Sequence, residues 1–202
     1  NKIEISDSNQ TAPLIFENDN ESMGNVILNH ELLTSAKDAL IKKNILFNNI
    51  DISLTDILKN NVIQIKNNKF KFKHLILCLG KNFSNQKIVS KYTFVGDHKS
   101  YVGFFKHTYH HSQTAYEIFT PNGPLAILPA PSKSKKVSTF IYSSNQKTSY
   151  ENIKKLIKQK FNASHGKLVF DKESYQFEIL PHLSKPKSHQ FFLIGDALRS
   201  IH

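Results

Sequence analysis

Two short apolar runs that end in glycine restrict the fold more than any other feature of the sequence. Residues 74–80 read HLILCLG, and residues 190–196 read QFFLIGD. Continuous apolar runs of this length are typical of strands that are buried on both faces. Ligands of open α/β sheets bind at the carboxyl ends of such strands. The runs therefore predict two buried strands, with candidate ligand contacts at Gly80 and Gly195.

The residues between these runs predict a long antiparallel region. A helix is expected over 149–161, because its apolar residues share one stripe and its lysines lie opposite. That stripe consists of Ile153, Leu156, Ile157 and Phe161. Strands are expected at 100–109, 113–119, 123–131, 136–143 and 174–181, with a tight turn over 120–124.

The N-terminal part of the chain combines strands with one helix. The helix begins at Asn29, which can cap it, and ends near Lys42 and Lys43. Its apolar face would contain Leu32, Leu33, Ala36, Ala39 and Leu40. Strands are expected at 3–5, 13–17, 24–30 and 45–53, and a hairpin over 62–72 that turns around Asn67 and Asn68.

Composition favours a globular protein outside the membrane. The chain has 202 residues, 39% of them hydrophobic, which suffices for one good-sized domain or two small ones. No apolar run approaches the roughly 20 residues that cross a bilayer. A single cysteine, Cys78, allows no internal disulfide, so a cytoplasmic setting is the default. Within its apolar strand, Cys78 is expected to pack rather than to react.

The basic charge does not indicate a nucleic-acid partner. The formal net charge is +11, but Arg199 is the only arginine among the 27 basic residues. Specific recognition of phosphates and bases depends on the bidentate guanidinium group, which lysine lacks. His107, His110 and His111 lie close together and could bind a metal. Because no acidic or cysteine partner is near them in the sequence, ordinary histidines of the sheet or surface are favoured.

A carboxylate follows the second apolar run directly. Asp196 would stand at the carboxyl end of a buried strand, where it can accept hydrogen bonds from the hydroxyl groups of a sugar or ribityl chain. Residues 197–201 could begin a helix, in which case Asp196 would serve only as its N-cap. Both interpretations remain open from the spacing alone.

Two segments resemble flavoprotein aromatic hydroxylases of the para-hydroxybenzoate hydroxylase type. FLIGDALRSIH, residues 192–202, resembles the family's strand-Gly-Asp-helix motif, whose Asp binds the ribityl chain of FAD. TAYEIFTPNGPLAILPAP, residues 114–131, is similar to a stretch of the ubiquinone-biosynthesis hydroxylases in which Phe-Thr-Pro-x-Gly-Pro-Leu-Ala-x-Leu-Pro recurs. Residues 3–8 and 23–40 also resemble consecutive segments of this family, so the resemblance covers nearly the whole chain in order.

The resemblance implies a mixed α/β fold. A Rossmann-like FAD-binding domain, incomplete in this chain, would be interleaved with a substrate domain built on a mostly antiparallel sheet. Residues 1–28 and 97–186 would belong to the substrate domain, and residues 29–96 and 187–202 to the FAD-binding domain. The chain would then be an internal part of a longer protein.

The resemblance also implies a reaction and its partners. FAD, NAD(P)H and dioxygen would hydroxylate the aromatic ring of a polyprenylated ubiquinone precursor. The cofactor contacts would include Gly80, Gly195, Asp196, Ala197 and Asn25. The substrate would lie near Phe119, Pro121, Gly123 and Pro124. The family leaves open a homodimer, a ubiquinone-biosynthesis complex, and peripheral association with the inner face of the membrane, for which the lysine-rich helix 150–161 would be suited.

Several departures from the family affect these expectations. Leu79 stands where the family has the Asp of a second Asp-Gly motif that contacts FAD and is implicated in NAD(P)H binding. The dinucleotide fingerprint G-x-G-x-x-G is absent from the sequence. We therefore expect an active enzyme in the longer parent, and little FAD binding by the 202-residue chain alone. The alternative is a non-catalytic remnant or scaffold that has lost flavin binding.

Overall fold

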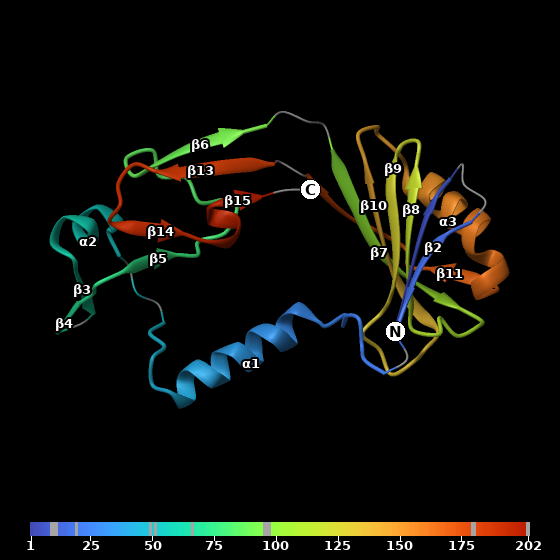
Figure 1. The fold of residues 1–202 in the computed structure, drawn as a ribbon, viewed down its shortest axis with the longest axis horizontal. Coiled ribbons are helices and arrows are strands. Elements are labelled where there is room, and N and C mark those ends of the chain that lie inside the picture. Colours follow the sequence, from blue (N-terminus) through green and yellow to red (C-terminus); the bar gives the residue numbers. More distant parts are fainter. Residues whose placement is uncertain are drawn as a thin grey trace. The chain divides into compact units, whose positions relative to one another are not determined.

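The computed structural model describes residues 1–8, 12–18, 20–48, 50, 52–65, 67–94, 98–178 and 181–200. The chain forms two compact units, each assembled from two separate segments. The first unit contains Asn1–Ala36 and Asp97–Ile179, and the second contains Lys37–Gly96 and Leu180–His202. Figure 1 shows the elements of each unit.

The first unit is built on an eight-stranded sheet in the order β11-β7-β10-β9-β8-β1-β2, with β12 also paired to β7. The long strands β7 (Lys99–His107), β8 (Thr114–Thr120), β9 (Gly123–Pro129) and β10 (Val137–Ser144) pair antiparallel, as predicted. β11 (Leu168–Phe170) and β12 (Tyr175–Glu178) both pair with β7. β1 (Lys2–Asp7) pairs parallel to β8 and antiparallel to β2 (Leu14–Glu17).

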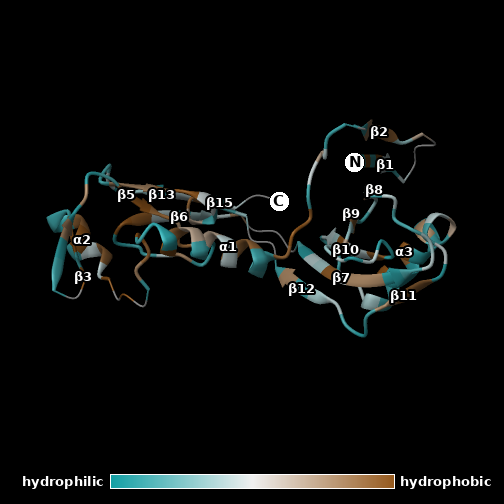
Figure 2. Cartoon of the chain, turned by 90° about the horizontal axis from the view of Figure 1, so that it is seen from below, coloured by the Kyte–Doolittle hydropathy of each residue, from teal (hydrophilic) through white to brown (hydrophobic). Residues whose placement is uncertain are grey.

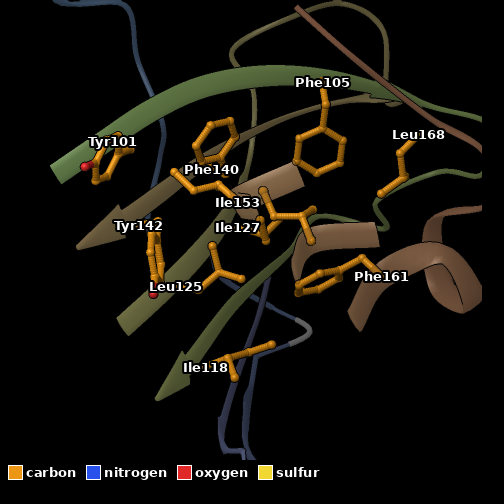
Figure 3. Close-up of a cluster of buried hydrophobic side chains, with 11 residues drawn as sticks. Tyr101, Phe105, Ile118, Leu125, Ile127, Phe140, Tyr142, Ile153, Phe161 and Leu168 are labelled. Carbon is orange, nitrogen blue, oxygen red and sulfur yellow. The ribbon is translucent and has the colours of Figure 1, made fainter. Parts of the chain in front are cut away.

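Helix α3 (Tyr150–His165) covers one face of this sheet. The Ser149 side chain caps the helix by accepting a hydrogen bond from the backbone N–H of Asn152. The predicted stripe is correct, because Ile153, Ile157 and Phe161 are buried against the sheet. Figure 3 shows Ile153 and Phe161 of this helix facing aromatic and aliphatic side chains of β7, β8, β9 and β10.

A tight turn joins β8 to β9, as predicted for residues 120–124. Gly123 has a φ of 131°, and a Cβ added there would lie 2.0 Å from the carbonyl oxygen of Ser143. Only glycine fits this position, because the backbone conformation and the neighbouring strand both exclude a side chain. The Thr120 hydroxyl donates a 2.6 Å hydrogen bond to the Gly123 carbonyl and closes the turn.

The second unit contains α2 (Leu54–Asn60) and three small sheets. β5 (Leu75–Leu77) pairs parallel with β14 (Phe191–Leu193), and β3 (Val62–Ile65) forms a hairpin with β4 (Asn68–Lys71). β13 (His182–Pro186) lies between β6 (Val89–Thr93) and β15 (Arg199–Ser200). A separate core packs α2, β5, β6 and β14 together, and it contains Leu58, Leu77, Ile88, Val89, Phe191, Leu193 and Ala197.

Several sequence predictions were wrong in the second unit. Residues 45–53 form no strand where they are described, and α2 follows, capped by Ser53. β5 and β14 are each buried on one face only, since Ile76 and Phe192 are more than half exposed. β13, assigned by sequence to the substrate segment 97–186, pairs with β6 and β15 of the second unit.

The predicted C-terminal helix is also not formed. Gly195–Ala197 make a single 3₁₀ turn, and β15 follows directly because its backbone pairs with β13. Ile201, which the predicted helix included, lies outside the described residues. The sequence signal for a helix was therefore overridden by strand pairing between distant segments.

Residues 24–30 do not form the predicted strand. Helix α1 (Asn29–Lys42) includes the last two residues of this segment. Val26 and Ile27 are exposed, and no strand pairs with them among the described residues. The predicted helix is present, but none of its residues is buried. Its Leu33 is 70% exposed, and Figure 2 shows hydrophobic and hydrophilic residues along it.

Candidate functional site

The two apolar runs that ended in glycine lie side by side. In the parallel pair of β5 and β14, Leu77 is opposite Leu193, and the Ile194 N–H donates a 3.2 Å hydrogen bond to the Leu77 carbonyl. Gly80 and Gly195 follow these residues, so both come after the carboxyl ends of paired parallel strands. The two strands predicted from these runs are therefore neighbours in one small sheet, a pairing that the sequence alone did not predict.

Both glycines leave open space at this edge of the sheet. Gly80 has a φ of 73° and Gly195 has a φ of 59°. Residues that carry a side chain rarely adopt such positive φ values. A Cβ added at either residue would find no atom within 4 Å. Backbone conformation, rather than crowding by the protein, therefore accounts for glycine at these positions, and a ligand could approach the backbone closely.

Asp196 presents a free carboxylate beside these glycines. Its backbone carbonyl accepts a 2.9 Å hydrogen bond from Nε2 of the buried His182, which holds the turn in place. Its carboxylate is exposed and receives no hydrogen bond from the described part of the chain. Ala197 is 1% exposed and packs in the core, so a ligand could reach only its backbone.

The loop after Gly80 is held by two lysine side chains. Lys91 Nζ donates to the carbonyls of Lys81 (2.6 Å) and Phe83 (3.4 Å), and Lys187 Nζ donates to the carbonyl of Gln86 (2.6 Å). These bonds join β6 and the segment after β13 to the loop. The loop that follows β5 is therefore hydrogen-bonded both to β6 and to the segment after β13.

This edge fits the hydroxyl-bearing part of a flavin cofactor. Asp196 supplies an acceptor for hydroxyl groups, and the glycines supply exposed backbone. Leu79, where the resembled family has an Asp, is 51% exposed and contributes no polar atom from its side chain. The residues present therefore offer one carboxylate contact to a ribityl chain, where the resemblance implies two acidic contacts with the cofactor.

The predicted substrate residues all belong to the hairpin of β8 and β9. Phe119 and Pro124 are paired across the two strands, and Phe119 is 52% exposed. Pro121 occupies the turn, and Gly123 has the conformational role described above. Phe119 and Pro124 are therefore the members of this group that present side chains from the sheet.

A pocket of about 550 Å³ opens on the same unit. Its walls come from β1, the segment 22–26, the start of β8 and the end of β9. Asn25, predicted as a cofactor contact, lines this pocket together with Ile3, Ala115 and Leu128. The volume lies within the range of ligand sites, roughly 300–1,000 Å³.

Two of the histidines of segment 107–111 have other partners in the structure. No group of three or more potential ligands with metal-binding geometry occurs among the residues that the structure describes. His107 donates to the Tyr109 carbonyl (2.6 Å) and contacts Ser138 Oγ (3.0 Å), while His111 accepts from the Gln113 N–H (3.0 Å). His110 is exposed. Both nitrogens of His107 are therefore already engaged within the protein.

Two features of this unit were missed from the sequence. His165, from α3, packs with its ring centroid 4.8 Å from that of His107, and burial lowers its pKa to about 4. Burial also lowers the pKa of His107 and His111. Glu117 was the other omission, although it is the one acidic residue within the otherwise uncharged strand β8.

Cys78 also differs from its prediction. It follows the last residue of β5 and is exposed rather than packed, because the strand ends at Leu77, before the apolar run does.

The fold is similar to that of flavin-dependent halogenases. The flavin-dependent brominase Bmp2 matches 99% of this chain at 10% identity, with a TM-score of 0.64. The halogenase PltM matches all of it at 13% identity (TM-score 0.57), and the flavin-dependent halogenase CmlS matches 84% at 14% identity (TM-score 0.53). The chain spans 55%, 47% and 34% of these proteins, respectively.

The sequence comparisons are negative. No family model and no curated protein matches this sequence. Within the described part of the chain, no helix has the length and apolar character needed to cross a membrane. The similarity to solved structures therefore identifies the fold and leaves the reaction to be argued from the residues.

Proposed function

We propose that this chain is part of a flavin-dependent monooxygenase that hydroxylates the aromatic ring of a polyprenylated ubiquinone precursor, with NAD(P)H as reductant. One observation carries the proposal: Gly80, Gly195 and Asp196 follow the carboxyl ends of two paired parallel strands. This is the position at which α/β sheets bind cofactors. The second unit then contributes to the FAD site, and the sheet of the first unit contributes to the substrate site.

The residues have separate roles in this proposal. Asp196 accepts hydrogen bonds from the ribityl hydroxyls of FAD, and the glycines allow close approach of the cofactor. Bound FAD, once reduced, supplies the activation of dioxygen. The sheet of the first unit positions the aromatic ring and excludes water. The choice of hydroxylation over halogenation rests on the TPNGPLAILP segment, which resembles the ubiquinone-biosynthesis hydroxylases.

A FAD titration tests the cofactor site. We expect Asp196→Ala to weaken FAD binding about tenfold, because it removes hydrogen bonds to an ionised acceptor. The measurement is the quenching of FAD fluorescence by the purified chain and by the longer parent protein. Asp56→Ala removes an exposed carboxylate of α2 in the same unit and serves as the control. Equal FAD affinity of the Asp196 variant and wild type would contradict the site.

A non-catalytic remnant is the second candidate, and Leu79 is the observation that favours it. If the site has lost only this acidic contact, Leu79→Asp should strengthen FAD binding. If neither the chain, the parent protein nor the Leu79→Asp variant binds FAD, the fold persists without its cofactor and the enzyme proposal is wrong.

A further inference from the structure

The strand β8 presents two chemically different faces. Thr114 and Ile118 are buried on the side covered by α3. Successive side chains of a strand point to opposite faces, so Ala115, Glu117 and Phe119 lie on the other side. Glu117 is thus a carboxylate on the sheet face that α3 does not cover.

The strand register surrounds Glu117 with apolar side chains. Its direct neighbours are Ile5 on β1 and Ala126 on β9. The same cross-strand row continues through Leu14 at one end and through Ile141, Val102 and Tyr175 at the other. Glu117 is the only charged residue in this row.

Glu117 has no partner in the described part of the protein. The ion pairs formed there join Lys2 to Glu4 and Lys154 to Glu151, and no hydrogen bond reaches the Glu117 carboxylate. The residue is partly buried, and desolvation alone raises its pKa. A carboxylate that is partly removed from water without a partner costs free energy, which a ligand that donates a hydrogen bond would recover.

The pocket described above lies along the same sheet face, and its nearest lining residues on β8 and β9 are two positions from Glu117 and Ala126. Ala115, two residues earlier on the same face of β8, lines it, and so does Leu128, two residues beyond Ala126 on β9. Two residues along a strand span about 7 Å. A ligand with its apolar part in the pocket can therefore place a polar group at Glu117.

We propose that Glu117 is the polar anchor of a small-molecule site on this sheet face, and that its occupant is an aromatic molecule that donates a phenolic hydroxyl to the carboxylate. The carboxylate accepts the O–H, and the apolar row and the pocket contact the ring and an alkyl substituent. The inference rests on the proposed function in taking an aromatic substrate as the ligand. It adds Glu117 as the group that recognises the hydroxyl.

A matched pair of probes tests the anchor without flavin. para-Butylphenol and its methyl ether, para-butylanisole, differ in the hydroxyl donor and share the apolar body. Isothermal titration of each probe into the 202-residue chain gives the preference for the hydroxyl. We expect Glu117→Leu to weaken phenol binding about tenfold and to leave anisole binding unchanged, because a charge-assisted hydrogen bond is lost. Glu117→Gln should lose part of the preference for the phenol over the anisole. Glu178 is an exposed residue of β12, and Glu178→Gln should keep the full preference.

The outcomes separate this inference from the proposed function. The anchor role of Glu117 would be wrong if Glu117→Leu weakened the binding of both probes equally or left phenol binding unchanged. It would also be wrong if the wild-type chain bound neither probe. Phenol binding that depends on Glu117 would support it even if FAD titration fails, in which case the flavin proposal alone is wrong. Circular dichroism of each variant checks the fold, and Glu117→Gln keeps the side-chain shape if Glu117→Leu does not fold.

Discussion

At the scale of single residues, the buried histidines are the most unusual feature of the first unit. His107, His111 and His165 come from β7, the following loop and α3, and all three are at most 6% exposed. His165 Nε2 finds no hydrogen-bond partner among the described residues. Burial lowers the pKa of all three rings, since a charge on any of them would be desolvated and close to another imidazole.

We expect acid to destabilise the first unit through His165. The unfolded state takes up a proton near the ordinary pKa of 6.5, whereas the folded state resists it until about pH 4. The unfolded state thus binds more protons between these values, so the free energy of unfolding falls as the pH falls through this window. The loss is on the order of 2 kcal/mol.

Urea denaturation at pH 7 and pH 4.5 measures this effect. His165→Phe keeps an aromatic ring without a titrating group, and its stability should depend less on pH than that of wild type. His189→Gln changes an exposed histidine and should behave as wild type. An unchanged pH dependence in His165→Phe would show that the other histidines or the carboxylates dominate.

At the scale of elements, backbone pairing decides more than local propensity. The β8–β9 hairpin agrees with its sequence because the turn residues and the strand alternation favour the same structure. The end of the chain does not, because pairing of β15 with β13 replaces the expected helix. The hairpin also holds the segment that resembles the hydroxylase family, and its glycine can be tested directly.

Gly123→Ala should destabilise the first unit by about 2 kcal/mol or more. The alanine would have to adopt the positive φ of Gly123, and its Cβ would collide with the Ser143 carbonyl. Gly24→Ala is the matched control, because a Cβ there meets no atom within 4 Å. The midpoints of thermal unfolding compare the two variants, and similar midpoints would mean that the turn relaxes around the added methyl group.

At the scale of the whole molecule, the described residues form two hydrophobic cores that share no residue. One joins α3 to the large sheet, and the other joins α2 to β5, β6 and β14 of the second unit. Each unit is assembled from segments that are separated in the sequence by the other unit. Stability should therefore be distributed between two cooperative regions.

Core truncations should act on one unit each. Phe140→Ala removes a fully buried ring of the first core and should raise hydrogen exchange in β7 and β10. Leu193→Ala should raise exchange in β5 and β14 instead, since Leu193 belongs to the second core. Hydrogen-exchange mass spectrometry resolves these strands, and equal effects of either variant on all four would indicate a single cooperative structure.

The sequence by itself determined the local elements with strong periodicity. The stripe of α3, the four long strands and the turn at Gly123 follow from patterns within a few residues, because burial and backbone conformation act locally there. The glycine-terminated runs also predicted strands that the structure contains as β5 and β14. Weak segments such as 24–30 and 45–53 were assigned wrongly, since their described residues pair with no other strand in the part of the chain that the structure covers.

Only the tertiary structure decided which distant residues meet. The parallel pairing of β5 with β14 joins two runs more than a hundred residues apart, and no local pattern encodes that register. The same is true of His165 beside His107, and of the apolar row around Glu117, which takes residues from several strands. Non-local pairing depends on the summed burial of the whole sheet, so these sites become visible only when the strands are in place.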